Sequence, residues 1–360
     1  MIAFVLSCVH SGERLPQLLS KTEEHHLYRA AFSQDEATQA RSLEIILSSS
    51  EKERADWTPI ALQSDSLYIR RTALSAISKS GDLDKDIFNQ LSAGDRCWYL
   101  LEAQNRSGLE FSGLSLNELR LEEKFTCSVY LHTSGDSEPL VRLLSSDLLT
   151  SIVYPYEALS GVLDPSLEVA MEQAYLNGLD SYQVTLLMAW LCGSSKKAQD
   201  IFDEQIKDLD EESILEQIEL LLRFQPERIK PLLQKIDRHT NTPYAKLALV
   251  SIGEDSANTA MRYLLEEEAS RTVRETAARS LGGWLEKHNV EKKRTKTVDD
   301  VEEALKLALK DEDPRVQIAA IQSLGFASSR ALSWLQDLEV QDDEAKVEIV
   351  ASIRAISGKR

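Results

Sequence analysis

The feature that most constrains the fold is an apolar pattern that returns about every thirty residues through the second half of the chain. Its clearest copy, spaced by four and ended by a glycine, is Val316, Ala320, Leu324 and Gly325. Side chains spaced by four lie on one face of an α-helix, so the stripe predicts a helix with one buried side. Asp313 and Pro314 favour a helix start before it. We expect Gly325 to end the helix in the left-handed conformation.

The same stripe recurs four times before this copy, at nearly constant steps. The copies are Val273, Ala277, Leu281, Gly282; Tyr244, Ala248, Ile252, Gly253; Ile214, Ile218, Leu222, Arg223; and Val184, Met188, Cys192, Gly193. From 193 to 325, their last residues lie 30, 30, 29 and 43 positions apart. A second apolar run follows each stripe, so the repeating unit is a helix A, a turn and a helix B.

Two further copies and one insertion complete the pattern. The copies are Ile69, Ala73, Ile77 near the start and the looser Val347, Ala351, Ala355 at the end. The long step contains the basic segment KHNVEKKRTKTVD at 287–299, and removing its 13 residues restores a step of 30. We expect an inserted loop there. Its Lys292, Lys293 and Arg294 are candidate contacts for an acidic partner, and the alternative is a loop without a binding role.

These repeats predict an all-α fold, an α-solenoid in which antiparallel helix pairs stack into a superhelix. A lone pair of short helices buries too little apolar surface to offset the entropy lost when its backbone is ordered. Stacking buries both faces of each pair and leaves a long curved groove as the binding surface. Glycine and proline number only 14 and 9 among 360 residues, which suits an almost wholly helical chain.

The repeats share the motif V-R-x-x-A-x-x-x-L-G. It reads TVRETAARSLG at 272–282, YIRRTALSAIS at 68–78 and RVQIAAIQSLG at 315–325. On these motifs the chain resembles the HEAT-repeat superfamily, in particular the short repeats of bacterial phycobilin-lyase-like proteins. Gln317 and Arg223 depart from it by replacing the motif's arginine and glycine. The resemblance implies a groove that binds proteins. In the lyases that groove chaperones a bilin onto a protein thiol, and no residues here match that role.

On this pattern the chain divides into three parts. Residues 1–23 form an N-terminal segment, 24–180 carry degenerate helical repeats, and 181–360 carry regular ones with the basic insert. The pattern is followed worst over residues 100–180. Within them, residues 122–136 fit either a short strand or a bent helix.

The charge balance argues against nucleic acid as the partner. Lys and Arg number 41 against 59 Asp and Glu, a net charge of −18, whereas proteins that bind nucleic acid neutralise phosphates with basic side chains. Acidic clusters at 203–213 and 265–270 either keep the array soluble or attract a basic partner.

We find no catalytic, cofactor-binding or metal-binding constellation in the sequence. The histidines are His10, His25, His26, His132, His239 and His288, and no two have the i, i+4 spacing of a helical zinc site. Cys8, Cys97, Cys127 and Cys192 show no C-x-x-C spacing, and Cys192 fits a small core position. We therefore predict no cofactor and a chain that is not an enzyme.

The N-terminus leaves two compartments open. The residues before Cys8 resemble the box that is cleaved in bacterial lipoproteins, which makes Cys8 a candidate lipidation site. Against this, no Lys or Arg precedes the apolar run. No other segment is apolar over the length of a membrane span. The expected location is the cytoplasm, and the alternative is a lipid anchor in the cell envelope or periplasm.

Three functional hypotheses result. The first is a non-catalytic scaffold or adaptor that binds protein partners in its groove. The second is an envelope lipoprotein scaffold anchored through Cys8. The third is a lyase-like modifying enzyme or its chaperone subunit.

Overall fold

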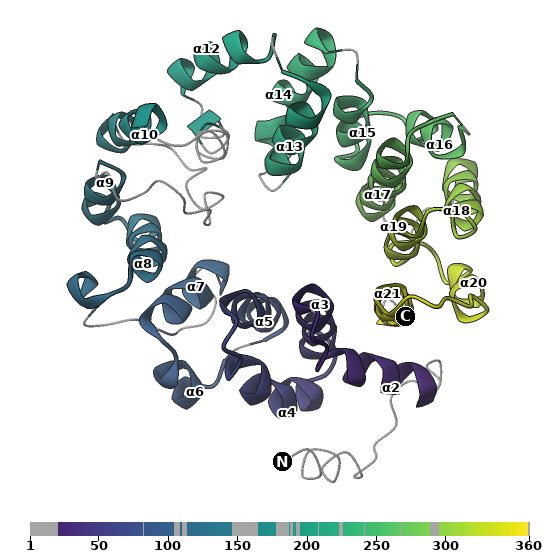
Figure 1. Ribbon diagram of the computed structural model, residues 1–360, viewed down its shortest axis with the longest axis horizontal. Coiled ribbons are helices and arrows are strands. Elements are labelled where there is room, and N and C mark those ends of the chain that lie inside the picture. Colours follow the sequence, from purple (N-terminus) through teal and green to yellow (C-terminus); the bar gives the residue numbers. More distant parts are fainter. Residues whose placement is uncertain are drawn as a thin grey trace.

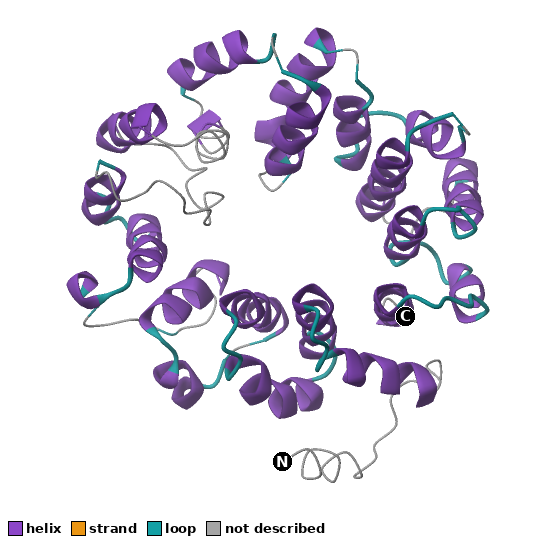
Figure 2. Cartoon of the chain, viewed as in Figure 1, coloured by secondary structure: helices purple, strands orange, loops and turns teal. Residues whose placement is uncertain are grey.

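The computed structural model describes residues 21–358, apart from 82, 104–108, 110–113, 146–164, 178–186, 188, 189, 192–194, 208, 223–225, 241, 267 and 289–294. Within these residues every regular element is a helix (Figure 2). The all-α prediction is confirmed. Over 122–136, the helix alternative holds and the strand does not, because α8 spans Leu121–Thr133.

The helices form an inner and an outer layer around a ring (Figure 1). The inner helices A are α3 (Glu36–Leu47), α5 (Leu67–Ser80), α7 (Ala93–Ala103), α8, α13 (Glu211–Leu221), α15 (Tyr244–Ser251), α17 (Arg271–His288), α19 (Pro314–Leu324) and α21 (Asp343–Gly358). The outer helices are α2 (Lys21–Ala30), α4 (Glu51–Leu62), α6 (Lys85–Gln90), α9 (Glu138–Leu144), α10 (Pro165–Asn177), α12 (Lys196–Gln205), α14 (Pro226–His239), α16 (Ala257–Leu265), α18 (Lys296–Ala308) and α20 (Ala331–Gln336). A short 3₁₀ helix, η2 (Leu116–Glu118), precedes α8. Neighbouring helices pack in chain order, as an α-solenoid requires.

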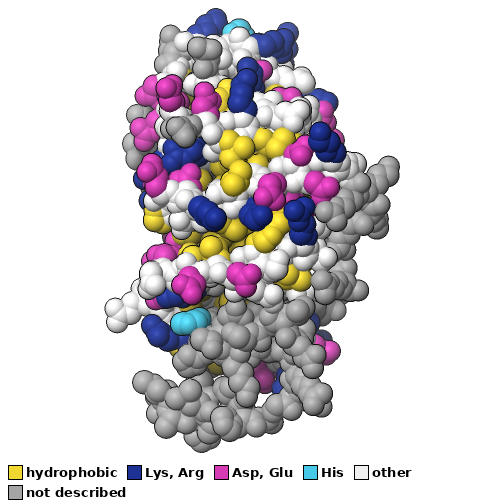
Figure 3. All heavy atoms as spheres, turned by 90° about the vertical axis from the view of Figure 1, so that its right-hand side faces the viewer, with side chains coloured by type: hydrophobic (Ala, Val, Ile, Leu, Met, Phe, Trp, Pro, Cys, Tyr) yellow, Lys and Arg dark blue, Asp and Glu magenta, His cyan; other side chains and the backbone are white. Residues whose placement is uncertain are grey.

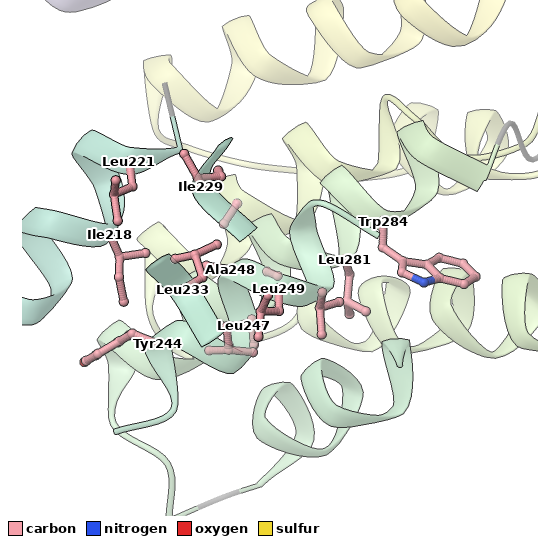
Figure 4. Packing of buried hydrophobic residues seen from close by; sticks show 14 of the residues in the cluster. Ile218, Leu221, Ile229, Leu233, Tyr244, Leu247, Ala248, Leu249, Leu281 and Trp284 are labelled. Carbon is pink, nitrogen blue, oxygen red and sulfur yellow. The ribbon is translucent and has the colours of Figure 1, made fainter. Parts of the chain in front are cut away.

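Three of the predicted stripes lie wholly in the core between the layers, and the stripe of Val184, Met188 and Cys192 lies outside the described residues. The buried ones are Ile69, Ala73, Ile77; Val273, Ala277, Leu281; and Val316, Ala320, Leu324. Figure 4 shows how residues of α13 to α17 interdigitate. Two stripe positions were wrong. Leu222 is exposed because α13 turns Leu221 inward instead, and Ala355 of α21 is exposed while Ile353 and Ile356 are buried.

The glycines that end the motif have a packing role, which corrects the expectation of left-handed helix ends. Gly325 has φ −59°, and Gly282 lies inside α17, which continues to His288. A Cβ at Gly282 would lie 2.6 Å from Oγ of Ser323 on α19. Only a glycine lets these two inner helices approach so closely. Gly253, with φ +80°, does adopt the left-handed conformation.

The long step of the repeat is partly helical. α17 runs to His288 and α18 starts at Lys296, so both ends of the predicted loop at 287–299 belong to helices. The division of the chain at residues 23 and 180 stays a prediction.

The solenoid closes on itself, which the repeat pattern did not predict. One hydrophobic core runs from α8 to α21, and a second runs from α2 to α7. Val347 and Val350 of α21 belong to the second core, so the last helix packs against the first ones. α21 lies next to α2 and α3 where the ring closes (Figure 1).

A disulfide joins the two cores at their other boundary. It links Cys97 of α7 to Cys127 of α8, and both residues are fully buried. The two cysteines are 30 residues apart, the same as the repeat step, so they occupy neighbouring inner helices.

Candidate protein interaction surface

Both sets of site residues that the sequence nominated lie outside the described part of the chain. These are Cys8 and the basic group of Lys292, Lys293 and Arg294. We therefore built the candidate surface from the inner helices. Among the described residues, the helices A pack against outer helices and against neighbouring inner helices, and their remaining side faces the centre of the ring (Figure 1).

One register defines this inner face. Counted from the N-cap residue, positions 2, 6, 9 and 13 follow the helical repeat of 3.6 residues and fall on one side. In α5, with Ser66 as N-cap, they are Tyr68, Thr72, Ser75 and Lys79. None of these four is buried, whereas the positions between them include the core residues Ile69, Ala73 and Ile77. The inner face is hereafter the set of residues in this register.

Contacts between neighbouring helices confirm that the register is shared. Ser270 caps the N-terminus of α17, and Arg279 lies nine residues after it. Asp313 is the N-cap of α19, and Gln322 likewise lies nine residues after it. The Arg279 guanidinium donates to the Gln322 side-chain oxygen at 2.7 Å. Arg279 also pairs with Glu275 on its own helix.

One part of the inner face is aromatic. Tyr68 is 54% exposed at the start of α5. Trp98 of α7 is half-buried and donates from its indole N–H to Ser75 Oγ at 3.1 Å. The Arg71 guanidinium lies 4.6 Å from the centre of the Trp98 ring and donates to Thr126 of α8. These contacts hold the ring of Trp98 in place, and Tyr68 is exposed on the preceding inner helix.

Another part of the inner face is acidic. α13 has Asp210 as N-cap, so its inner-face positions are Glu212, Glu216 and Glu219. All three are exposed. Glu212 lies in the acidic segment 203–213, for which the sequence left open a solvated face or a site for a basic partner, and Glu216 and Glu219 follow it on α13.

The outer surface is different in character. Figure 3, seen from the side of α16, α18 and α20, shows hydrophobic side chains among both signs of charge. Leu265 and Leu307 are exposed there. Trp334 of α20 is covered by Lys306 and Arg330, whose charged groups lie 4.9 and 5.1 Å from its ring centre. Arg330 in turn lies near acids of α18, so this tryptophan is held in a local charge network.

The described residues offer no metal centre and no membrane span. In them, no three His, Cys, Asp or Glu side chains gather closely enough to hold an ion. Each described helix is too short or too polar to cross a bilayer.

The stacked helix pairs define the protein as an α-solenoid. A family model of HEAT repeats matches residues 259–356, the stretch from α16 to α21. This stretch is similar to HEAT repeats, and the described helix pairs before it continue the same stack. The match supports the predicted resemblance to the HEAT-repeat superfamily, and it does not confirm the phycobilin-lyase-like subtype. A search of curated proteins finds no match to the chain.

Proposed function

We propose that the protein is a binding scaffold that holds a segment of another protein on its inner face. The observation that carries the proposal is the pairing of an aromatic area at Tyr68 and Trp98 with an acidic one on α13. Tyr, Trp and Arg are the residues that dominate binding energy at protein interfaces. HEAT repeats are typically used for protein binding, which supports the same assignment.

The chemistry of the inner face indicates the kind of partner. Glu212, Glu216 and Glu219 attract Lys and Arg side chains and repel acidic surfaces. Tyr68 presents an apolar ring with a polar tip. The proposed partner segment therefore carries basic residues together with an apolar side chain.

Substitutions on the inner face test the proposal. Captured partners, identified by cross-linking and mass spectrometry, are titrated against purified chain. Tyr68→Ala should weaken binding about 10- to 100-fold, the range of an interface hot spot. The triple change of Glu212, Glu216 and Glu219 to Gln should slow association and remove most of its dependence on salt.

Leu307→Ala is the matched control, because Leu307 is also 54% exposed but lies on outer helix α18. Binding by this variant should equal that of the wild type. A partner that binds all three variants equally, or that loses affinity only with Leu307→Ala, would show that the inner face is not the binding surface.

A second candidate, an envelope scaffold, is favoured by the disulfide. Buried disulfides such as Cys97–Cys127 persist in oxidising compartments and are rare in the cytosol. This favours export over the cytoplasmic location that we first expected, with Cys8 as the candidate anchor. In cells, Cys8→Ser should move the protein from the membrane to the soluble fraction, whereas a cytoplasmic protein would not move. Within the described residues, no observation favours a lyase-like activity.

A further inference from the structure

The two ends of the chain together build one repeat of the ring. α21 takes the place of a helix A, and α2, from the other end, packs on it in the place of a helix B (Figure 1). α21 also contacts α3 as one inner helix contacts the next. The register agrees, because Arg41 and Glu348 each lie six residues after the residue that caps their helix, Asp35 and Asp342. The closing repeat, formed by α21 and α2, therefore packs like the other repeats, except that no loop connects its two helices.

The closing joint is also a boundary between two cores. Ile349, Ile353 and Ile356 of α21 belong to the core that runs back to α8. Val347 and Val350 belong to the core of α2 to α7. Helices α2 to α7, hereafter the arm, thus form a unit with its own core that meets the rest of the ring at two joints.

The arm's other joint is fixed covalently. The Cys97–Cys127 disulfide ties α7 to α8. Arg71 of α5 adds a buried hydrogen bond to Thr126 of α8 at 3.2 Å. Separation of the arm at this joint would require the disulfide to break, whereas the joint at α21 is held by non-covalent contacts.

The closing joint depends on ion pairs. Glu348 is 2% exposed and accepts two hydrogen bonds from Arg41, at 2.7 and 3.0 Å. A buried carboxylate that loses its partner is strongly destabilising. A second pair joins Arg354 of α21 to Glu53 of α4 at 3.3 Å, and Glu53 also accepts from Tyr28 of α2 at 2.8 Å.

Like charges oppose the same closure. The pKa of Glu344 on α21 is raised, first by burial and then by the charges of Asp342, Glu348 and Asp35. Asp35 caps α3 and so lies on the arm. Glu344 is exposed, and of these charges only Asp35 acts across the joint, where it opposes the attraction between Arg41 and Glu348.

We propose that the arm is a gate. The ring opens at the joint between α21 and helices α2 to α4, while the disulfide-linked joint between α7 and α8 holds. Opening breaks one repeat interface and leaves the others intact, as expected where stability is a sum of neighbour contacts. The gate controls access to the inner face irrespective of what binds there.

Charge reversal at the closing joint tests the gate in the full-length protein. Arg41→Glu and Glu348→Arg each place like charges together, and the double variant restores the pair with its signs exchanged. Each single variant should show a larger radius of gyration by X-ray scattering. Amide exchange in α2 and α21 should rise about 100-fold or more. Exchange in α7, α8 and α13 to α19 and the helical circular dichroism should stay as in the wild type, and the double variant should recover the closed dimensions.

Arg274→Glu is the control, because it breaks an ion pair of the same kind, with Asp311, between α17 and the loop before α19 at an ordinary repeat. It should leave the radius of gyration unchanged. Two results would overturn the gate. One is single variants with wild-type dimensions and exchange. The other is exchange that rises equally in all helices, because the arm would then not open as a separate unit.

Discussion

Single residues repeat the same role from one helix A to the next. Four residues after the N-cap, a side chain donates a hydrogen bond to a carbonyl of the loop just before the helix. The donors are Gln39, Arg70, Arg274, Gln317 and Lys346, with distances from 2.6 to 3.2 Å. This position of the motif therefore ties α3, α5, α17, α19 and α21 to their own loops.

The departure of Gln317 from the motif is explained by this role. Gln317 keeps the bond to the loop carbonyl, at the Asp311 oxygen. It lacks the second function of the arginines, which reach an acid of the next repeat. Arg70 pairs with Asp95, and Arg274 with Asp311, in each case at 2.9 Å.

The Arg274–Asp311 pair predicts a dependence of stability on pH. Burial alone would raise the pKa of Asp311, but hydrogen bonds from Arg274 and from the Asp313 N–H, with the charge of Arg274, bring it below its ordinary value of 3.8. The unfolded chain therefore takes up the proton first as pH falls. Asp311→Asn should lower the free energy of unfolding by about 1 kcal/mol at pH 7.

That difference between wild type and Asp311→Asn should shrink as the pH drops through and below about 4. Urea unfolding at a series of pH values measures it. A difference that stays constant or grows at low pH would contradict the ionised pair.

Close helix approach at Gly282 predicts a steric effect. Gly282→Ala would place a methyl group 3.0 Å from the Ser323 Cα. A backbone atom cannot move aside as a flexible side chain can, so the two helices would have to separate. The free energy of unfolding should fall by about 1–3 kcal/mol. Gly325→Ala should be milder, because its nearest contacts on α21 lie at 3.2 and 3.3 Å. Thermal unfolding compares the two, and equal effects would contradict the packing role.

At the scale of elements, the sequence predicted helices well where their partners are neighbours in the chain. Ile69, Val273 and Val316 face the repeats next to them, so local periodicity contains the information. α21 was read wrongly because its second apolar face, with Val347 and Val350, packs on helices from the opposite end of the chain. Periodicity within one helix cannot show a partner some three hundred residues away.

The disulfide also escaped the sequence analysis, although a signal was present. Cys97 and Cys127 are separated by one repeat step, so the period itself placed them on neighbouring inner helices. A spacing of 30 residues matches no short metal or redox motif, so such motifs do not reveal the pair. Tyr68 and Trp98 of the candidate surface could not be predicted from the sequence either. Whether a side chain of an inner helix is exposed depends on how the neighbouring helices pack against it, and local periodicity does not show that packing.

The disulfide should stabilise the joint between α7 and α8. In the chain-entropy account, a crosslink that closes a loop of 30 residues contributes about 3–4 kcal/mol. The Cys97→Ala/Cys127→Ala variant should unfold at correspondingly lower urea concentration than the oxidised protein. Digestion without reductant should yield the linked peptides, and recovery of both cysteines as free thiols from fresh protein would contradict the bond.

At the scale of the whole molecule, the repeats specify a curve and the ends of the chain complete it. Each helix pair is rotated slightly relative to the pair before it, and the total rotation over all pairs decides whether the ends of the chain meet. The sequence of a single repeat does not show this total rotation. Closure at α21 then adds the pair of Arg41 with the buried Glu348 carboxylate, and apolar contacts that an open array would leave exposed to water.

The most direct test of the closed ring is a distance measured between its ends. Ser48, Lys79 and Ala355 are exposed and lie thirteen residues after the N-caps of α3, α5 and α21. Spin labels on encoded amino acids at Ser48 and Ala355 span the closing joint, and labels at Ser48 and Lys79 span an ordinary one. The ring predicts two narrow distance distributions with the same centre. A broad distribution for Ser48 and Ala355, centred well beyond that of the reference pair, would show that the chain ends do not meet.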